Sequence, residues 1–413
     1  MTADYDSHPS DLAGPGPQSG VTIDSLKKAI PKHCFKSSYR QGFTILFQDL
    51  STAALLALLA IKFIPLIPST ALRIAAWAIY GLTQGFVFTG IWVIAHECGH
   101  YAFTPSKPLN DTLGFILHSF LLTPYFSWKS THRRHHIYAN NMALDHNYVP
   151  PRADEYSASF SSRIEDLTED APLVTALRIL LQQLLGFPAY LALNITAAPS
   201  SLPAKPSSRP LENGHFAPWG ALFRAEEAHL ILASDAGLMA MCGILHYARQ
   251  HVGIATVFAV YVVPYLWTNH WIVAITYLHH THTDVPKYEA DAWSFVRGAT
   301  STVDRDLGIV GRVFMHGIVD YHVVHHLFPR IPCYHAREAT EAIVPVLGDA
   351  YHSAKTENFM ASLWRTFVGC QYVVPRGETA GVRDGKLWYK GGRCPPVQTG
   401  MGTKRWLIWP DVL

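Results

Sequence analysis

Four apolar segments of about 20 residues constrain the fold of this chain more than any other feature of its sequence. They lie at about residues 48–68, 71–95, 228–246 and 253–277, and each is long enough to cross a bilayer as an α-helix. Short loops join the first to the second and the third to the fourth. Hydrophobic residues make up 49% of the chain and charged residues 15%, as expected for a surface that faces lipid. The sequence therefore predicts an all-α, polytopic membrane protein with four transmembrane helices in two hairpins.

Two further apolar stretches are expected to lie at the membrane interface rather than to cross it. Residues 112–127 are short for a span. Residues 173–197 carry Arg178, Gln182 and Gln183 at spacings that place all three on one helix face.

The segment before the first span predicts the orientation. Residues 1–20 are polar and rich in proline and glycine, so we expect disorder and no cleavable signal peptide. Positive side chains then follow at Lys27, Lys28, Lys32, Lys36 and Arg40. They favour a cytoplasmic N-terminus, although a solvated basic helix is an alternative. We expect a basic segment (1–40), a membrane-bound domain (41–350) whose cytoplasmic helical cap comprises 96–227 and 278–350, and a cytoplasmic tail (351–413).

Charge and cysteine content exclude other classes of protein. Lys and Arg total 33 against 31 Asp and Glu, which leaves no strongly basic character for binding nucleic acid. Six cysteines lie far apart without a C-x-x-C pair, so neither a disulfide scaffold nor a zinc finger is indicated.

Histidine is the unusual component, with 23 residues that include three tight clusters. Within each cluster the spacing is i, i+3 or i+4, which places the imidazoles on one helix face. The clusters contain His96 and His100; His132, His135 and His136; and His322, His325 and His326. A further ligand is available at the end of the fourth span, where His279, His280 and His282 compete. We expect a metal site.

The ligand type indicates two irons. A structural zinc ion is satisfied by four ligands and usually takes thiolates, whereas eight or nine imidazoles suit two metals with open positions. Such a pair can use O2 to attack an unactivated methylene. Carboxylates near the clusters in sequence could orient the imidazoles or be solvated caps: Asp145, Asp284, Asp304, Asp306 and Asp320. Glu97 is expected to point away from His96 and His100, and Arg133 and Arg134 to face a partner, a headgroup or solvent.

A single metal site requires all clusters on one side of the membrane. The number of crossings between His136 and His280 must then be even, yet three apolar stretches lie between them. We expect residues 173–197 not to cross, and we expect the sequons at Asn110 and Asn194 to stay unglycosylated.

Several long strings, taken together, resemble the membrane-bound fatty acyl desaturases, in particular their microsomal omega-6 (Δ12) and omega-3 branch. The resemblance covers roughly residues 25–350. It rests on AHECGH (95–100), FLLTPYFSWKSTHRRHHIYANN (120–141), DHNYVPP (145–151), TYLHHTH (276–282), STVDRDLG (301–308) and HVVHHLFPRIPCYHAREAT (322–340).

The resemblance implies a non-haem di-iron centre in a cytoplasmic cap over the spans, O2 as oxidant, and electrons from NADH through cytochrome b5 and its reductase. It implies eight metal ligands at the clustered histidines named above, and it favours His280 as the ninth. No His-Pro-Gly-Gly haem motif is visible, so we expect cytochrome b5 to be a separate protein, with Arg133, Arg134, Arg305, Arg312 and Arg330 as candidates for its docking patch. Departures from the family pattern occur at His279, Asp284 and Lys287.

The expected activity is insertion of a cis double bond into a phospholipid- or CoA-bound acyl chain, at Δ12 of oleoyl chains, in the endoplasmic reticulum membrane with both termini cytoplasmic. A Δ15/omega-3 or dual desaturase, a hydroxylase, an acetylenase and a conjugase are alternatives within the same chemistry. A histidine-rich metal transporter or receptor is a remote alternative, since a transporter would place its ligands at mid-span.

Overall fold

The computed structural model describes residues 20–167, 171–375 and 384–391. The predicted disordered segment, apart from its last residue, lies outside this described part, as do residues 376–383 and 392–413 of the predicted tail.

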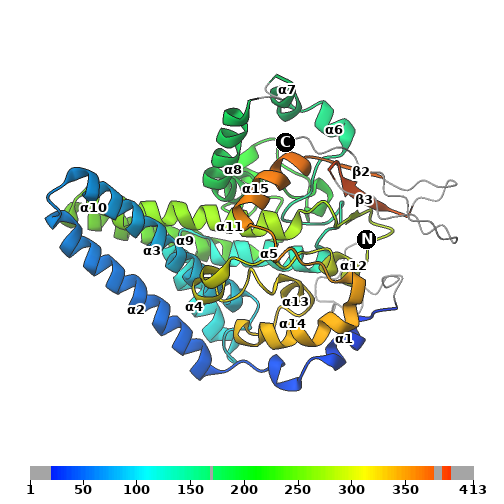
Figure 1. Cartoon of the computed structure of the whole chain (residues 1–413), viewed down its shortest axis with the longest axis horizontal. Helices are drawn as coiled ribbons and strands as arrows, with labels where there is room; N and C mark the ends of the chain where they lie inside the picture. Colours follow the sequence, from blue (N-terminus) through cyan, green and yellow to red (C-terminus); the bar gives the residue numbers. More distant parts are fainter. Residues whose placement is uncertain (1–19, 168–170, 376–383, 392–413) are drawn as a thin grey trace.

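Two helical hairpins form the elongated half of the molecule (Figure 1). The first consists of α2 (Tyr39–Phe63), a short extension η3 (Ile64–Leu66) and α3 (Thr70–Gly99). Pro65 and Pro68 interrupt the helix between them, and the Ser69 hydroxyl caps α3 by accepting the Leu72 N–H.

The second hairpin begins with α9 (Ala228–Val252), which ends at Gly253 with a φ of 81°. Glycine adopts this left-handed conformation without strain. The chain returns through α10 (Ile254–Val257), the π-helical turn η7 (Phe258–Val262) and α11 (Val263–His280). The four predicted spans therefore correspond to helices, each somewhat longer than the apolar core that predicted it.

A fifth helix, α8 (Pro172–Leu193), is also long and apolar enough to cross a membrane by length and composition. It packs against α11, and in Figure 1 it stands across the direction in which α11 runs. The other predicted interfacial stretch is divided between α4 (Lys107–Phe120) and α5 (Tyr125–Tyr138).

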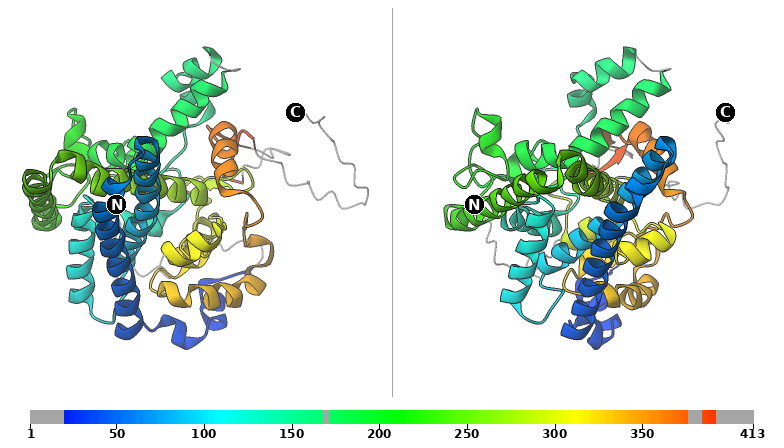
Figure 2. Two further views of the ribbon diagram at one scale, coloured as in Figure 1. Left: turned by 60° about the vertical axis from the view of Figure 1, so that its left-hand side comes forward. Right: turned by 90° about the vertical axis from the view of Figure 1, so that its left-hand side faces the viewer.

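Shorter helices form a compact part at one end of the hairpins, visible from two more sides in Figure 2. Its N-terminal helix α1 (Ile23–Ala29) and the turn η2 (Lys32–Phe35) pack on α14 (Cys333–Leu347). The remaining elements are α6 (Ala153–Ser157), α7 (Phe160–Leu167), η4 (Pro199–Ser201), η5 (Pro210–Asn213), η6 (Ala225–Glu227), α12 (Phe295–Thr300), η8 (Val310–Phe314), α13 (His322–Leu327), η9 (Gly348–Ala350) and α15 (Phe359–Gly369).

A small antiparallel sheet departs from the predicted all-α class. It has the strand order β1-β3-β2, with β1 at Lys287–Tyr288, β2 at Val373–Pro375 and β3 at Lys386–Tyr389. Leu387 and Tyr389 alternate inward from β3 and pack with Cys370 and Val373. Two stretches of the predicted tail, 351–375 and 384–391, thus belong to the compact part of the fold. The strands are too short for alternating hydrophobicity to be recognised in the sequence.

Close packing of α3 on α11 brings the ends of both hairpins together. A Cβ atom on Gly85 of α3 would lie 2.3 Å from the Cβ of Trp267 on α11, so only glycine permits this approach. His96 and His280, near the ends of these two helices, consequently face the same region of the compact part.

Candidate metal centre

Four helices bring the predicted histidines to one place. His96 lies in the last turn of α3 and His100 caps its end. His132, His135 and His136 lie on α5, His280 ends α11, and His322, His325 and His326 lie on α13. The structure therefore brings all nine candidate ligands together from segments as distant as residues 96 and 326.

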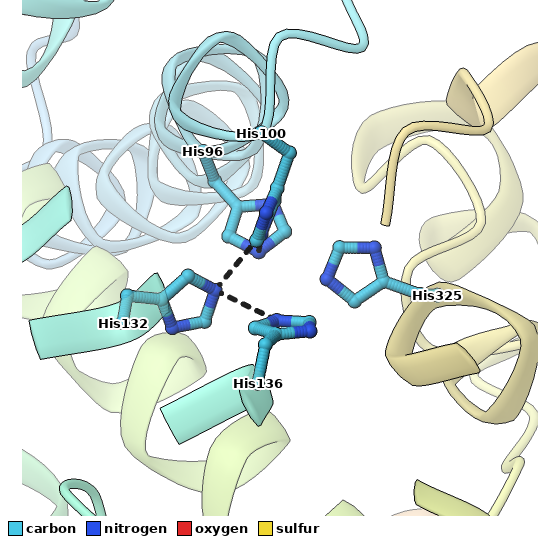
Figure 3. Close-up of side chains that lie close together, drawn as sticks. All are labelled: His96, His100, His132, His136 and His325. Carbon is cyan, nitrogen blue, oxygen red and sulfur yellow. Dashed lines mark hydrogen bonds between the residues drawn. The ribbon is translucent and has the colours of Figure 1, made fainter. Parts of the chain in front are cut away.

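The first group contains five imidazoles whose donor atoms lie within 4.8 Å of one another: His96, His100, His132, His136 and His325. Figure 3 shows their rings converging from three helices. The Nε2 atom of His132 lies 3.1 Å from that of His100 and 3.1 Å from that of His136. His325 closes the group from α13, with its ring centre 4.6 Å from that of His96.

The second group contains His135, His280 and His326, again with donor atoms within 4.8 Å of one another. His280 Nε2 lies 3.3 Å from His135 Nε2 and 3.1 Å from His322 Nε2, so His322 joins this group. The two groups are adjacent, because the His326 ring stacks on that of His136 at 4.1 Å.

Buried nitrogen atoms test whether these residues suit metal ions. Among the described residues, His325 Nε2 and both ring nitrogens of His326 are buried and have no hydrogen-bond partner. An unsatisfied buried polar atom costs about 1–3 kcal/mol, so protein contacts alone explain this concentration of imidazoles poorly. Two metal ions would satisfy nitrogens of this kind, and the donor set fits them.

The clustered histidines are also in the protonation state that metal binding requires. Burial, reinforced by the neighbouring histidines, holds the pKa of His132, His136, His322 and His325 well below the ordinary value for histidine. Neutral imidazole is the form that binds metals. These side chains are therefore available as ligands at neutral pH.

Two of the five carboxylates that were candidates for orienting the imidazoles do support the clusters. Asp145 Oδ1 lies 2.7 Å from His135 Nδ1. Asp304 accepts the backbone N–H of Val323 at 2.8 Å and so holds α13 rather than an imidazole. The others have different contacts: Asp306 and Asp320 pair with Arg312, and Asp284 contacts Thr283.

Glu97 corrects a prediction, because it does not point away from the clusters. Its Oε1 atom lies 3.5 Å from His96 Nδ1 and 3.9 Å from His325 Nδ1. Its Oε2 atom accepts the backbone N–H of Cys333, the first residue of α14. Helical spacing on α3 did not reveal this contact, because α14 and α13 approach α3 from the side that Glu97 occupies.

Two of the five arginines proposed for a docking patch are buried. Arg134 donates to the carbonyl oxygen of Leu222 at 2.8 Å. Arg305 is 1% exposed and donates to the carbonyl oxygen of Leu278. Both residues therefore support the fold, and neither faces a partner, a headgroup or solvent. Arg133, Arg312 and Arg330 remain exposed or partly exposed.

The three histidines that competed for the ninth position have different surroundings. His279 contacts the carbonyl oxygen of Val303 through Nδ1 at 2.5 Å. His282 Nε2 lies 3.6 Å from Glu357. Of the three, only His280 belongs to the metal-ligating groups found among the described residues.

A cavity of about 650 Å³ lies beside the histidines. Six of the nine contribute to its wall, from both groups: His96, His132, His135, His280, His322 and His326. Much of the remaining wall is apolar and includes Trp92, Phe187, Leu185, Ile272 and Ile275. The cavity can place a hydrocarbon chain next to the candidate metal centre.

Sequence comparisons agree with this geometry. The fatty acid desaturase family model matches residues 74–357. The chain is 41% identical to an omega-6 fatty acid desaturase of the endoplasmic reticulum from Brassica juncea, over 89% of this chain and 91% of the relative. It is 42% identical to a delta(12)-fatty-acid desaturase from Arabidopsis thaliana, with the same coverage. It is also 40% identical to an oleate hydroxylase from Claviceps purpurea, over 89% of this chain and 80% of the relative.

Proposed function

The chain belongs to the fatty acid desaturase family, and on that premise we propose that it is a di-iron enzyme that inserts a cis double bond at Δ12 of oleoyl chains. Nine clustered imidazoles beside an apolar cavity support this proposal most directly. The Δ12 position rests on the names of its relatives from Brassica juncea and Arabidopsis thaliana.

The two groups of histidines would each hold one iron. His96, His100, His132, His136 and His325 would hold the first, and His135, His280, His322 and His326 the second. When bound, the irons supply an oxidant that can remove hydrogen from an unactivated methylene. The substrate loses two hydrogens, a donor supplies two electrons and the solvent supplies two protons, so that O2 is reduced to two molecules of water.

The protein's own contribution is to orient the substrate and exclude water. The aromatic and aliphatic wall would bind the acyl chain in an extended or bent form and place one pair of methylenes at the metals. A shift of one C–C bond changes the product, so regiochemistry depends on the shape of this wall. Trp92 and Trp128 flank His96, with ring centres 5.8 and 5.6 Å from it, and both line the cavity beside it.

A hydroxylase is the second candidate, because the Claviceps purpurea relative is an oleate hydroxylase. The two activities share the first hydrogen abstraction and differ in the fate of the substrate radical. The same ligands and cavity would serve both.

Electrons would come from NADH through a separate cytochrome b5 and its reductase, and the enzyme would reside in the endoplasmic reticulum membrane with both termini cytoplasmic. Cytochrome b5 would dock on the compact part, where Arg133, Arg312 and Arg330 remain candidates for an electrostatic contact.

We propose four spans, with α8 at the interface. Because His136 and His280 meet in one centre, an even number of helices must cross between them, and α8, α9 and the α10–α11 segment are the three candidates. The polar stripe of Arg178, Gln182 and Gln183 favours α8 as the helix that does not cross. The Arg178 guanidinium lies 5.3 Å from the ring centre of Phe367 on α15. The transverse direction of α8 in Figure 1 also suits an interfacial helix.

Product analysis tests the activity. The chain is expressed in a yeast host that makes oleate but no linoleate, and total fatty acids are analysed by gas chromatography with mass spectrometry. A new 18:2 Δ9,12 acid is expected, and the His325→Ala variant controls for host activity. A 12-hydroxy acid as the only new product would show that the chain is a hydroxylase and not a desaturase. Failure of iron-loaded, reducible protein to convert oleoyl lipid would contradict both.

Glycosylation mapping tests the topology. A glycosylatable tag inserted after Asn194 is expected to remain unmodified, whereas the same tag inserted after Pro68, in the loop of the first hairpin, is expected to acquire sugar. An endoglycosidase-sensitive shift from the Asn194 position would show that α8 crosses the membrane.

A further inference from the structure

A second group of metal-ligating side chains lies apart from the histidine centre. It joins the turn η2 to the helix α14 and contains His33, Cys34, His335 and Glu338, whose donor atoms all lie within 4.8 Å of one another. We propose that these four residues form a structural zinc site, which is independent of the proposed desaturase activity.

The donor set is suited to zinc. A thiolate, two imidazoles and a carboxylate are all ligands that Zn²⁺ accepts, and four protein ligands complete a closed structural site. A tetrahedral ion with ordinary Zn–S and Zn–N bonds separates sulfur from nitrogen by about 3.6 Å. The Sγ atom of Cys34 lies 3.7 Å from Nε2 of His33.

The other two ligands, His335 and Glu338, lie on one helix close to the first two. His335 and Glu338 are three residues apart on α14 and so share a helix face. Glu338 Oε2 lies 2.8 Å from His33 Nε2, and the His33 and His335 ring centres are 5.3 Å apart. Small movements of these side chains would open the His33–Glu338 pair to the roughly 3.4 Å that two zinc ligands require.

One ligand of the proposed zinc site is buried and two are exposed to solvent. Cys34 is fully buried in an apolar cluster with Leu26, Ala339 and Ile343. This packing holds the residue in place. The side chains of His33 and Glu338 are 57% and 48% exposed, so an ion can reach the site from solvent. The site therefore has a fixed inner wall and an open outer edge.

The site would fasten the N-terminal segment to a helix that supports the catalytic centre. The first backbone N–H of α14, that of Cys333, donates to Glu97 beside His96 and His325. The ligands lie about 300 residues apart in sequence, which is why cysteine spacing gave no sign of them. Loss of zinc is expected to loosen α14 and lower thermal stability before it alters the metal content of the histidine centre.

The thiolate distinguishes this site from the all-imidazole centre. Full-length protein is purified in detergent, and its zinc is examined by X-ray absorption. We expect one sulfur scatterer at about 2.3 Å in the wild type and its loss in Cys34→Ser, with Cys242→Ser, at an exposed cysteine, as the matched control. His335→Gln is expected to lose about one zinc per chain by elemental analysis while iron is retained.

Chelation provides the second readout. EDTA is expected to lower the melting temperature of the wild type and of Cys242→Ser by more than that of His335→Gln, because the variant has only the metal of the histidine centre to lose. Zinc bound without any sulfur scatterer in the wild-type protein, or a sulfur shell that persists in Cys34→Ser, would overturn the proposal. Neither result depends on whether the enzyme makes a Δ12 product.

Discussion

Asp145 and His135 form a fully buried carboxylate–imidazole pair, with Oδ1 of Asp145 2.7 Å from Nδ1 of His135. The carboxylate is itself held by the backbone N–H groups of Asn140 and Asn147. This contact places the proton of His135 on Nδ1 and directs Nε2 toward His280 and the second group of histidines.

Replacing Asp145 with alanine is expected to lower iron affinity or turnover by about 10–100-fold, because outer-shell partners of ligating histidines typically have effects of that size. The iron content per chain measures the change in affinity, and the rate of linoleate formation measures the change in turnover. Asp306→Ala is the matched control, since Asp306 pairs with the exposed Arg312. Full iron content and unchanged turnover in Asp145→Ala would contradict the orienting role.

His135→Ala and His325→Ala are expected to abolish product formation, because each removes one ligand from a different group. Membrane insertion and abundance should stay close to wild type, as shown by immunoblotting of membrane fractions. Near-normal turnover by either variant would show that the ligand assignment is wrong.

Substitution of His280 and of the nearby His282 is expected to have opposite effects on iron content and activity. His280→Gln is expected to reduce iron content and activity severely, because its Nε2 atom lies 3.3 Å from that of His135 and 3.1 Å from that of His322. His282→Gln is expected to keep both, because His282 contacts Glu357 rather than the histidine groups. The reverse pattern would make His282 the ninth ligand.

Lys287 predicts a pH-dependent stability. Its side chain is 1% exposed, and its ammonium group donates to Asn140 Oδ1 at 2.6 Å. Burial lowers the pKa of Lys287 to about 8, against the opposing attraction of Asp145. The unfolded chain then binds more protons than the folded one between this value and the ordinary lysine pKa of about 10.4, so Lys287 makes stability rise with pH across that range.

The Lys287→Met variant should lack this rise. The melting temperature of the variant minus that of the wild type is expected to be highest below pH 8 and to fall from pH 8 to pH 10, because only the wild type gains stability over that range. Thermal unfolding of both proteins in detergent across this range measures the difference. A difference that is independent of pH would show that Lys287 keeps an ordinary pKa in the folded protein.

Local sequence patterns predicted the helical hairpins and eight of the clustered histidines. Apolar segments of about 20 residues have few stable alternatives to a membrane helix. Imidazoles spaced i, i+3 and i+4 share a face wherever the helix lies. These features depend on neighbours within one or two turns, so they could be recognised without knowledge of the fold.

Glu97 and Arg305 show where local patterns failed. Helical spacing placed Glu97 away from the histidines of its own helix, but α13 and α14 bring His325 and Cys333 to it. Arg305 carried the same charge as the exposed arginines, yet packing buried it against Leu278. In both cases the partner comes from a distant part of the chain, and helical periodicity holds no information about it.

The sequence by itself determined the helical hairpins and the grouping of imidazoles on single helix faces, because span length and imidazole spacing are properties of single helices. Only the tertiary structure decided how nine histidines divide into two groups, why His280 rather than His282 joins them, and that His33 and Cys34 meet His335 and Glu338. Those relationships depend on how α3, α5, α11, α13 and α14 pack, and packing arises from contacts between residues up to about 300 positions apart.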